Sequence, residues 1–252
     1  MKNIRIMPRL DIKGPNVVKP VHTEALHVVG DPKELAQRYY QQGADEIIYM
    51  DIVASLYGRN LDFDLLRSVT ENIFVPVTVG GGIRTIHDIN NALRAGADKV
   101  AINTYAIHRP EFISEAAKEF GSQCIVLSIE AKKQSDGFWE AYTDGGRESS
   151  GLDAIEWAKR GLELGAGELM ITSIDQDGTG RGYDLDLIKK ITSFVSVPVI
   201  VYGGAGNQES FLKVINDGGA DAVAAASVFH YRNLSIPGVK KFLKINGINV
   251  RT

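Results

Sequence analysis

The sequence predicts one α/β domain in which eight parallel strands alternate with eight helices and close into a (β/α)8 barrel. Short β-branched runs alternate with amphipathic stretches along all 252 residues, a pattern typical of a parallel sheet covered by helices. Motifs of the first half recur in the second half, and no linker-like segment divides the chain. We therefore expect a single domain over residues 1–252, with half-barrels at about 1–121 and 122–252.

Clusters of β-branched and apolar residues predict the eight strands. These are Ile4–Leu10, Glu46–Asp51, Val75–Val79, Lys99–Asn103, Cys124–Glu130, Glu168–Ser173, Pro198–Tyr202 and Ala222–Ala226. Helices are expected over 32–42, 61–72, 85–95, 109–119, 151–164, 184–194, 207–217 and 236–244. Asp31 is a good N-cap before Pro32, and Gly43 fits a left-handed helix end. Residues 131–150 are expected to form a long loop, with a hairpin through Phe138–Thr143.

The two halves share turns, glycine pairs and polar residues at a nearly constant offset. The offset is 122 residues for most motifs, 123 residues for the later ones and 119 residues near the start of the chain. The matching segments are Gly43-Ala44-Asp45-Glu46 with Gly165-Ala166-Gly167-Glu168, Gly58-Arg59 with Gly180-Arg181, Gly81-Gly82 with Gly203-Gly204, Gly96-Ala97-Asp98 with Gly219-Ala220-Asp221, Asn103-Thr104 with Ala226-Ser227, and Asp11 with Glu130. A repeat of four units favours a closed barrel over an open sheet.

Composition excludes several classes of function. The chain has 28 Lys+Arg against 31 Asp+Glu and a net charge of −3, so nucleic acid is not expected as a partner. No apolar run is long enough for a membrane span, and residues 1–20 lack a signal-peptide pattern. The single cysteine, Cys124, excludes an internal disulfide and a cysteine-cluster metal site, and it predicts a cytoplasmic protein. No metal or cofactor is expected.

Two glycine-rich loops follow strands three and seven, at the barrel end where catalytic sites lie. Glycine lets backbone N–H groups approach an anion, and a helix N-terminus adds partial positive charge. One predicted phosphate site combines Gly82 with Asn103 and Thr104, and the other combines Gly204 with Ala226 and Ser227. The alternative is that these glycines only turn the chain. Because the repeat relates the two loops, we favour an elongated ligand with a phosphate at each end.

Between these loops the repeat places one acid in each half, Asp11 and Glu130. Paired carboxyls at a barrel mouth suit general acid–base catalysis when their environments separate their pKa values; the alternative is a polar plug. Asp177 and Gly178, after strand six, bind ligand hydroxyls or cap a loop. Lys19 follows strand one in a loop broken by glycine and proline; it either closes over a phosphate or, as the sequence alone favours, lies solvated at the surface.

The opposite barrel end has its own charged pattern. Arg5, Glu46, Lys99 and Glu168 lie at the starts of strands one, two, four and six. If they point inward, they form a ring of alternating charge across the barrel floor. Buried charges are costly unless paired, so the ring is either a structural plug or the gate of a channel.

Several segments together are specific to one family. They are Leu10-Asp11-Ile12-Lys13, Val17-Val18-Lys19, Val79-Gly80-Gly81-Gly82-Ile83-Arg84, Arg94-Ala95-Gly96-Ala97-Asp98-Lys99-Val100, Phe120-Gly121-Ser122-Gln123-Cys124, Thr172-Ser173-Ile174-Asp175-Gln176-Asp177-Gly178-Thr179, Gly203-Gly204-Ala205-Gly206 and Ala225-Ala226-Ser227-Val228-Phe229-His230. Over nearly its full length, the chain resembles the cyclase subunit of imidazole glycerol phosphate synthase. The resemblance implies a heterodimer in which a glutaminase docks at the strand N-termini and ammonia passes through the barrel. It implies a bisphosphorylated ribotide substrate, cleaved and cyclised to an imidazole with an aminoimidazole carboxamide ribotide as second product.

The resemblance also implies roles for residues. The general base of the family falls on Asp11, its mobile-loop lysine on Lys19, and its subunit contact on Asp98 and Gln123. Its phosphate loops fall on the two predicted phosphate sites, and its ammonia gate falls on the four ring residues.

Two positions depart from the family pattern. Glu130 replaces the usual second aspartate, and Arg9 replaces the usual cysteine. Arg9 shares a strand face with Asp11, so it is expected to point inward, pair with Glu130 and hold that carboxyl ionised, the wrong state for a general acid. These departures also resemble a paralogous branch that conducts ammonia to a sugar amidotransferase for acetamidino groups of surface glycans. A non-catalytic scaffold is the third alternative.

Overall fold

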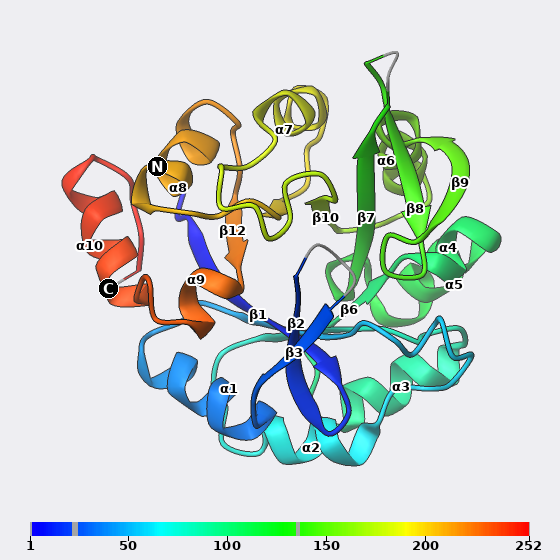
Figure 1. Cartoon of the computed structure of the whole chain (residues 1–252). Helices are drawn as coiled ribbons and strands as arrows, with labels where there is room; N and C mark the ends of the chain where they lie inside the picture. Colours follow the sequence, from blue (N-terminus) through cyan, green and yellow to red (C-terminus); the bar gives the residue numbers. More distant parts are fainter. Residues whose placement is uncertain (1, 22–24, 135–136, 252) are drawn as a thin grey trace.

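The computed structural model describes residues 2–21, 25–134 and 137–251. Eight parallel strands close into a barrel that is surrounded by helices (Figure 1). In barrel order they are β1 (Arg5–Lys13), β4 (Ile47–Asp51), β5 (Val77–Gly80), β6 (Lys99–Ile102), β7 (Ile125–Lys133), β10 (Glu168–Ser173), β11 (Val199–Tyr202) and β12 (Ala222–Ala225). The first and last strands pair in parallel, with Arg5 opposite Ala222. The predicted fold class and the closure of the barrel are confirmed.

Eight helices occupy the expected positions between the strands. They are α1 (Pro32–Gln41), α2 (Phe63–Thr70), α3 (Ile86–Arg94), α5 (Glu111–Phe120), α6 (Ala154–Glu163), α7 (Leu185–Thr192), α8 (Gln208–Asn216) and α10 (Ile236–Ile245). The side chain of Asp31 caps α1 by accepting a hydrogen bond from the backbone N–H of Glu34, at 3.0 Å. A short 3-10 helix covers Ser122–Cys124.

Two further helices, α4 (Thr104–His108) and α9 (Ser227–His230), were not expected. They have five and four residues, too few to show a helical period in the sequence. The residues that precede them have almost the same backbone geometry, with φ −123° and ψ −86° at Asn103 and φ −123° and ψ −78° at Ala226. This match supports the predicted repeat. The superposition of the two half-barrels stays a prediction.

Four strands lie outside the barrel and correct the predicted loops. The loop expected after β1 is a hairpin of β2 (Asn16–Val21) and β3 (Ala25–Gly30), drawn over the middle of the barrel in Figure 1. The segment 131–150 is largely strand, because β7 continues to Lys133 and pairs with β8 (Trp139–Thr143), which pairs with β9 (Glu148–Asp153). The expected hairpin through Phe138–Thr143 is therefore part of a three-stranded extension.

The barrel interior is layered, because alternate residues of each strand point inward. The ring residues lie at its floor, and a buried apolar layer lies above them. This layer includes Met7, Ile48, Ala101, Val126, Met170, Ile200, Ala222 and Ala224. Above it, the polar residues Arg9, Asp11 and Thr172 are buried near the carboxyl ends of the strands.

Across the described ranges, no helix combines the length and apolar character needed to cross a membrane.

Candidate active site

Three adjoining cavities lie at the carboxyl ends of the barrel strands. Their volumes are about 280, 60 and 10 Å³, and we call them the first, central and last cavities. Glu130 lines both the first and the central cavity, and Asp177 lines both the central and the last cavity. The cavities therefore follow one another across the barrel mouth.

The first cavity contains the three residues predicted to hold one phosphate, namely Gly82, Asn103 and Thr104. Gly82 has φ +70°, and a Cβ atom there would lie 2.7 Å from the carbonyl oxygen of Arg59. Only glycine fits this approach of two backbones. The Thr104 hydroxyl oxygen accepts a bond from the backbone N–H of Asp144, at 3.0 Å, so its own proton stays free to donate. Phosphate binding here stays a prediction.

The last cavity contains the residues of the second predicted phosphate site. Gly204, Ala226 and Ser227 line it together with Asp177 and Gly178. Gly204 has φ +114°, and a Cβ atom there would lie 2.1 Å from the carbonyl oxygen of Gly182. The glycine is therefore required by the fold, whether or not an anion binds there.

Asp11 lies on β1 in the central cavity and is only 2% exposed. Its Oδ1 accepts a hydrogen bond from Arg9 Nε at 2.7 Å, and its Oδ2 accepts a longer one from the Tyr202 hydroxyl at 3.4 Å. Burial acts to raise the pKa of Asp11, but the charges of Arg9 and then Lys19 outweigh it and hold this pKa below its usual value. Asp11 is thus a carboxylate with weakened basicity.

Glu130 is half-buried on β7, and its Oε2 accepts a hydrogen bond from Asn103 Nδ2 at 2.8 Å. Asn103 Nδ2 also donates to the carbonyl oxygen of Tyr142, at 3.0 Å. Burial raises the pKa of Glu130 to about 7, against the opposing charge of Arg9. A large fraction of Glu130 is therefore protonated at neutral pH and can donate a proton.

The predicted pairing of Arg9 with Glu130 is wrong. Arg9 does point into the barrel mouth, where it is 5% exposed, but its Nε donates to Asp11. The physical reason is proximity, since Asp11 lies two residues further along the same face of the same strand. The expected ionisation of Glu130 is wrong as well. Burial raises the pKa of Glu130 by more than the charge of the Arg9 guanidinium lowers it.

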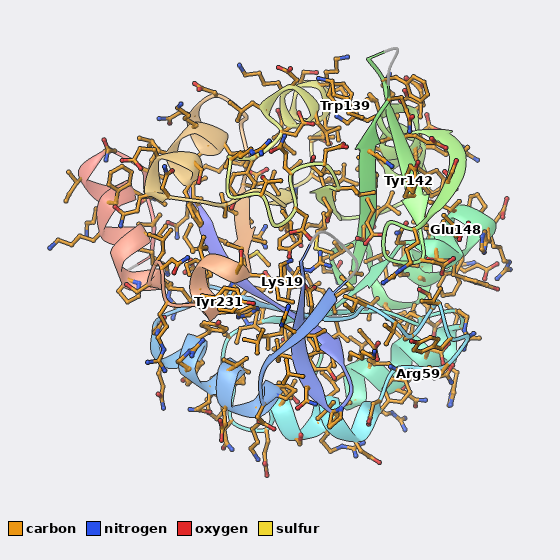
Figure 2. All side chains as sticks on the ribbon, viewed as in Figure 1. Lys19, Arg59, Trp139, Tyr142, Glu148 and Tyr231 are labelled. Atoms are coloured by element: carbon orange, nitrogen blue, oxygen red, sulfur yellow. The ribbon has the colours of Figure 1, made fainter. Side chains whose placement is uncertain are left out.

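Lys19 on β2 is 3% exposed, so the surface position favoured by the sequence is wrong. Its Nζ donates to the Tyr202 hydroxyl at 2.8 Å and to both Asp177 oxygens at 3.1 and 3.2 Å. It also lies 3.6 Å from Asp11 Oδ2. Figure 2 shows Lys19 where the hairpin crosses the barrel mouth. Lys19 therefore fastens the hairpin to the site.

Tyr202 was not identified from the sequence. Its ring lies 4.1 Å from Arg9 Cζ, a cation–π distance, and its hydroxyl joins Lys19 to Asp11. A signal was present, because the offset of 122 aligns Tyr202 with Gly80. In the first half, the space next to Gly80 is filled by the side chain of Met50 instead.

The floor ring has the alternating geometry that the sequence suggested. Arg5 contacts Glu46 at 2.8 Å and also binds Glu168. Lys99 Nζ lies 2.9 Å from Glu46 Oε2 and 2.8 Å from Glu168 Oε2. Each carboxylate therefore binds both cations, and the ring closes the end of the barrel opposite the active site. Its role as a gate stays a prediction.

Asp98 and Gln123 lie at this same end and are exposed. Asp98 Oδ2 also accepts a hydrogen bond from the backbone N–H of Val77 at 2.8 Å. Asp45 and Asp221 do the same for the backbone N–H groups of Ile6 and Val199, at 2.8 and 2.9 Å. Asp98 is thus one of three aspartates that fix the start of a neighbouring strand. Subunit contact stays a prediction.

Comparison with known proteins gives the family. The sequence model described as "Histidine biosynthesis protein" matches residues 5–235. The chain belongs to the histidine biosynthesis protein family. It is also 57% identical over 211 residues to the imidazole glycerol phosphate synthase subunit HisF of Legionella pneumophila. The aligned region covers 84% of this chain and all of the Legionella protein. The resemblance drawn from the sequence motifs is confirmed. The region matched to the histidine biosynthesis protein family includes all three cavities and the floor ring.

Proposed function

We propose that this chain is the cyclase subunit of imidazole glycerol phosphate synthase. The observation that carries the proposal is a pair of carboxyls, Asp11 and Glu130, that line one cavity and whose pKa values are shifted in opposite directions. Such a pair can accept and donate protons in one reaction. The identity to the Legionella protein supports the assignment. We place the reaction in the cytoplasm, on the grounds of the single free Cys124.

In this proposal, a bisphosphorylated ribotide spans the mouth with one phosphate in the first cavity and one in the last. Ammonia condenses with the ribotide, which is cleaved and cyclised to imidazole glycerol phosphate and an aminoimidazole carboxamide ribotide with loss of one water. Asp11 accepts a proton, and Glu130 donates one. The lowered pKa of Asp11 makes it a weak base. We therefore expect slow proton abstraction at this residue.

The decisive experiment mixes the purified chain with ammonium and the bisphosphorylated precursor. The expected result is the formation of imidazole glycerol phosphate. Chromatography detects and quantifies both products. Precursor that binds but is not converted would contradict the cyclase assignment. A chain that neither binds nor converts the precursor would contradict the phosphate sites as well.

We further infer that a glutaminase docks at the amino ends of the strands and that ammonia enters through the floor ring. Two large apolar side chains support a protein partner at this end, since Phe74 is 77% exposed just before β5 and Ile245 is 75% exposed at the end of α10. Exposed apolar side chains of this size are typical of interaction surfaces. Asp98 and Gln123 would contribute polar contacts at its edge.

Replacement of Lys99 by alanine tests the gate. The change removes one cation that holds Glu46 and Glu168 together. Turnover with free ammonium should remain largely intact, whereas turnover with glutamine in the two-subunit complex should fall relative to glutamine hydrolysis. The rates of product formation with free ammonium and with glutamine are measured side by side. An equal fall in both rates would show that the ring is structural.

The ion pair between Arg9 and Asp11 favours a second candidate function. A base that is already paired suits a barrel that conducts ammonia to a sugar amidotransferase, for acetamidino groups of surface glycans, better than one that performs the cyclisation. This candidate predicts that glutamine hydrolysis by the bound glutaminase is coupled to amidination of a sugar. Imidazole formation by the chain with free ammonium would contradict it.

A further inference from the structure

The first cavity extends beyond the residues predicted to hold phosphate. Its volume of about 280 Å³ includes an outer wall formed in part by Arg84 and His108. Arg84 follows the Gly81–Gly82 turn, and His108 ends α4. The wall therefore brings one permanent cation and one titratable group to the same opening.

His108 is placed by the helix that starts at the predicted phosphate site. Thr104 and His108 are four residues apart on α4 and so lie on one face of it. The imidazole is exposed, and it makes no hydrogen bond or ion pair with any residue in 2–21, 25–134 or 137–251. Its ring is therefore available to an occupant of the cavity.

Arg84 is held at the rim by neutral partners. Its Nη1 donates to the carbonyl oxygen of Gly58 at 3.0 Å, and its Nη2 donates to Asn60 Oδ1 at 2.6 Å. Within the described part of the chain, no carboxylate pairs with this guanidinium. Its charge is therefore not neutralised locally, and its remaining donors can bind an anion.

The other charged groups of the cavity are mostly occupied. Asp51 binds Arg59 through two bonds of 2.8 and 3.0 Å, and Glu130 is held by Asn103. Asp144, at the β8–β9 turn, is the remaining carboxylate in the lining.

On the side of α4, Tyr105 also lines the cavity. The next residue after His108, Arg109, is paired with Glu115 at 2.6 Å. When His108 is protonated, Arg84 and His108 place two positive charges at the opening. The carboxyls among the described lining residues are Asp51, which is paired with Arg59, Glu130, which is protonated below its pKa of about 7, and Asp144.

The two predicted phosphate sites differ in this respect. The repeat aligns His108 with Tyr231 and Arg84 with Gly206. The last cavity therefore lacks both cations at the corresponding positions, and Lys19 lies near it instead. The two ends of the active site are chemically distinct, although their glycine turns are alike.

We propose that Arg84 and His108 form a cationic rim that binds the oxygens of a phosphate monoester in the first cavity, and that protonation of His108 strengthens this binding. The inference rests on the phosphate sites of the proposed function. It adds a difference between the two cavities. The first cavity binds a phosphoryl group with an affinity that depends on pH through His108, whereas binding in the last cavity does not depend on a histidine.

Sulfate is the probe for this proposal, because it stays a dianion over the range from pH 5 to 8 in which histidine ordinarily changes charge. Sulfate is titrated into the full chain at pH 8 and pH 6, and binding is followed by NMR shifts of the Gly82 and Thr104 amides. Affinity should increase at the lower pH, by about two- to fivefold from His108, as expected for one added exposed charge pair, and further from the protonation of Glu130.

The variant His108→Gln should bind sulfate at pH 8 like the wild type and gain less affinity at pH 6 than the wild type does, because the part of the gain that remains comes from protonation of Glu130, whose pKa is about 7. His87→Gln is the matched control, because His87 is exposed on α3 and lies outside the cavity lining; it should keep the gain.

A pH-dependent gain in His108→Gln as large as that of the wild type would assign the whole gain to Glu130 and overturn the proposal. Sulfate binding without pH dependence in the wild type would overturn it and leave the phosphate sites standing. No shift at Gly82 or Thr104 would overturn both.

Discussion

Replacement of Glu130 by glutamine should lower the turnover number for imidazole formation with free ammonium by about two to four orders of magnitude, the usual contribution of a positioned acid. Glutamine keeps the side-chain length and an oxygen that can accept the bond from Asn103, which is 2.8 Å long with glutamate. It has no acidic proton that it could transfer to the substrate. Steady-state kinetics should therefore show a loss in kcat with KM nearly unchanged. A loss confined to KM would contradict a role in proton transfer.

The pH profile of the wild type provides an independent check on Glu130. A general acid must be protonated, and Glu130 is protonated below its pKa of about 7. The value of kcat should therefore decline as pH rises through about 7, when rates are compared at equal concentrations of free NH3. Glu130→Asp keeps a carboxyl and should retain a declining limb. A wild-type rate that increases through pH 8 under these conditions would contradict the assignment.

Replacement of Arg9 by methionine should destabilise the fold by up to about 3–5 kcal/mol at pH 7, because the buried charge of Asp11 loses its hydrogen-bonded cation and keeps only the Lys19 ammonium at 3.6 Å. Asp11 is 2% exposed, and the bond from Arg9 is 2.7 Å long. Urea unfolding measures the loss. Arg67→Met is the matched control, since its pairing with Asp64 is exposed and its removal should change stability little.

The pH dependence of this loss has a definite sign. The pKa of Asp11 is lowered in the folded protein, so its ion pair stabilises the fold above the unfolded pKa of about 3.9. That stability is lost as pH falls through the lower folded pKa. The difference between the wild type and Arg9→Met should therefore shrink below about pH 4. The double change Arg9→Met with Asp11→Asn should recover much of the stability at pH 7. A single variant as stable as the wild type would show that the pair contributes nothing.

The barrel strands could be predicted because parallel strands covered on both faces consist of short β-branched and apolar runs. The hairpin after β1 could not, since Gly14, Pro15 and Pro20 interrupt its pattern in the sequence. Its pairing depends on the continuation of β1 to Lys13, opposite Asn16. The short helix α4 was missed for another reason: one turn of helix has no period to detect.

The repeat placed Asp11, Glu130 and the two glycine-rich loops at one end of the barrel, but it did not give their partners. Strand parity placed Arg9 and Asp11 on one face, yet it left open whether Arg9 reaches along its own strand or across the barrel. The answer depends on the space available at the mouth, which Tyr202 limits by its ring. Burial of Lys19 likewise depends on the closure of the hairpin over Tyr202 and Asp177. Such contacts can be identified only from the three-dimensional structure.

The aspartates that fix the strand starts limit how the two halves can be exchanged. The repeat aligns Asp45 with Gly167, the one such turn that lacks the aspartate. A Cβ atom on Gly167 would lie 2.2 Å from the carbonyl oxygen of Ser122. Aspartate at position 167, the residue that the first half has at Asp45, could not be accommodated without moving Ser122–Cys124. The two halves have therefore diverged at this turn, and an exchange of this residue between them would need a compensating change in Ser122–Cys124.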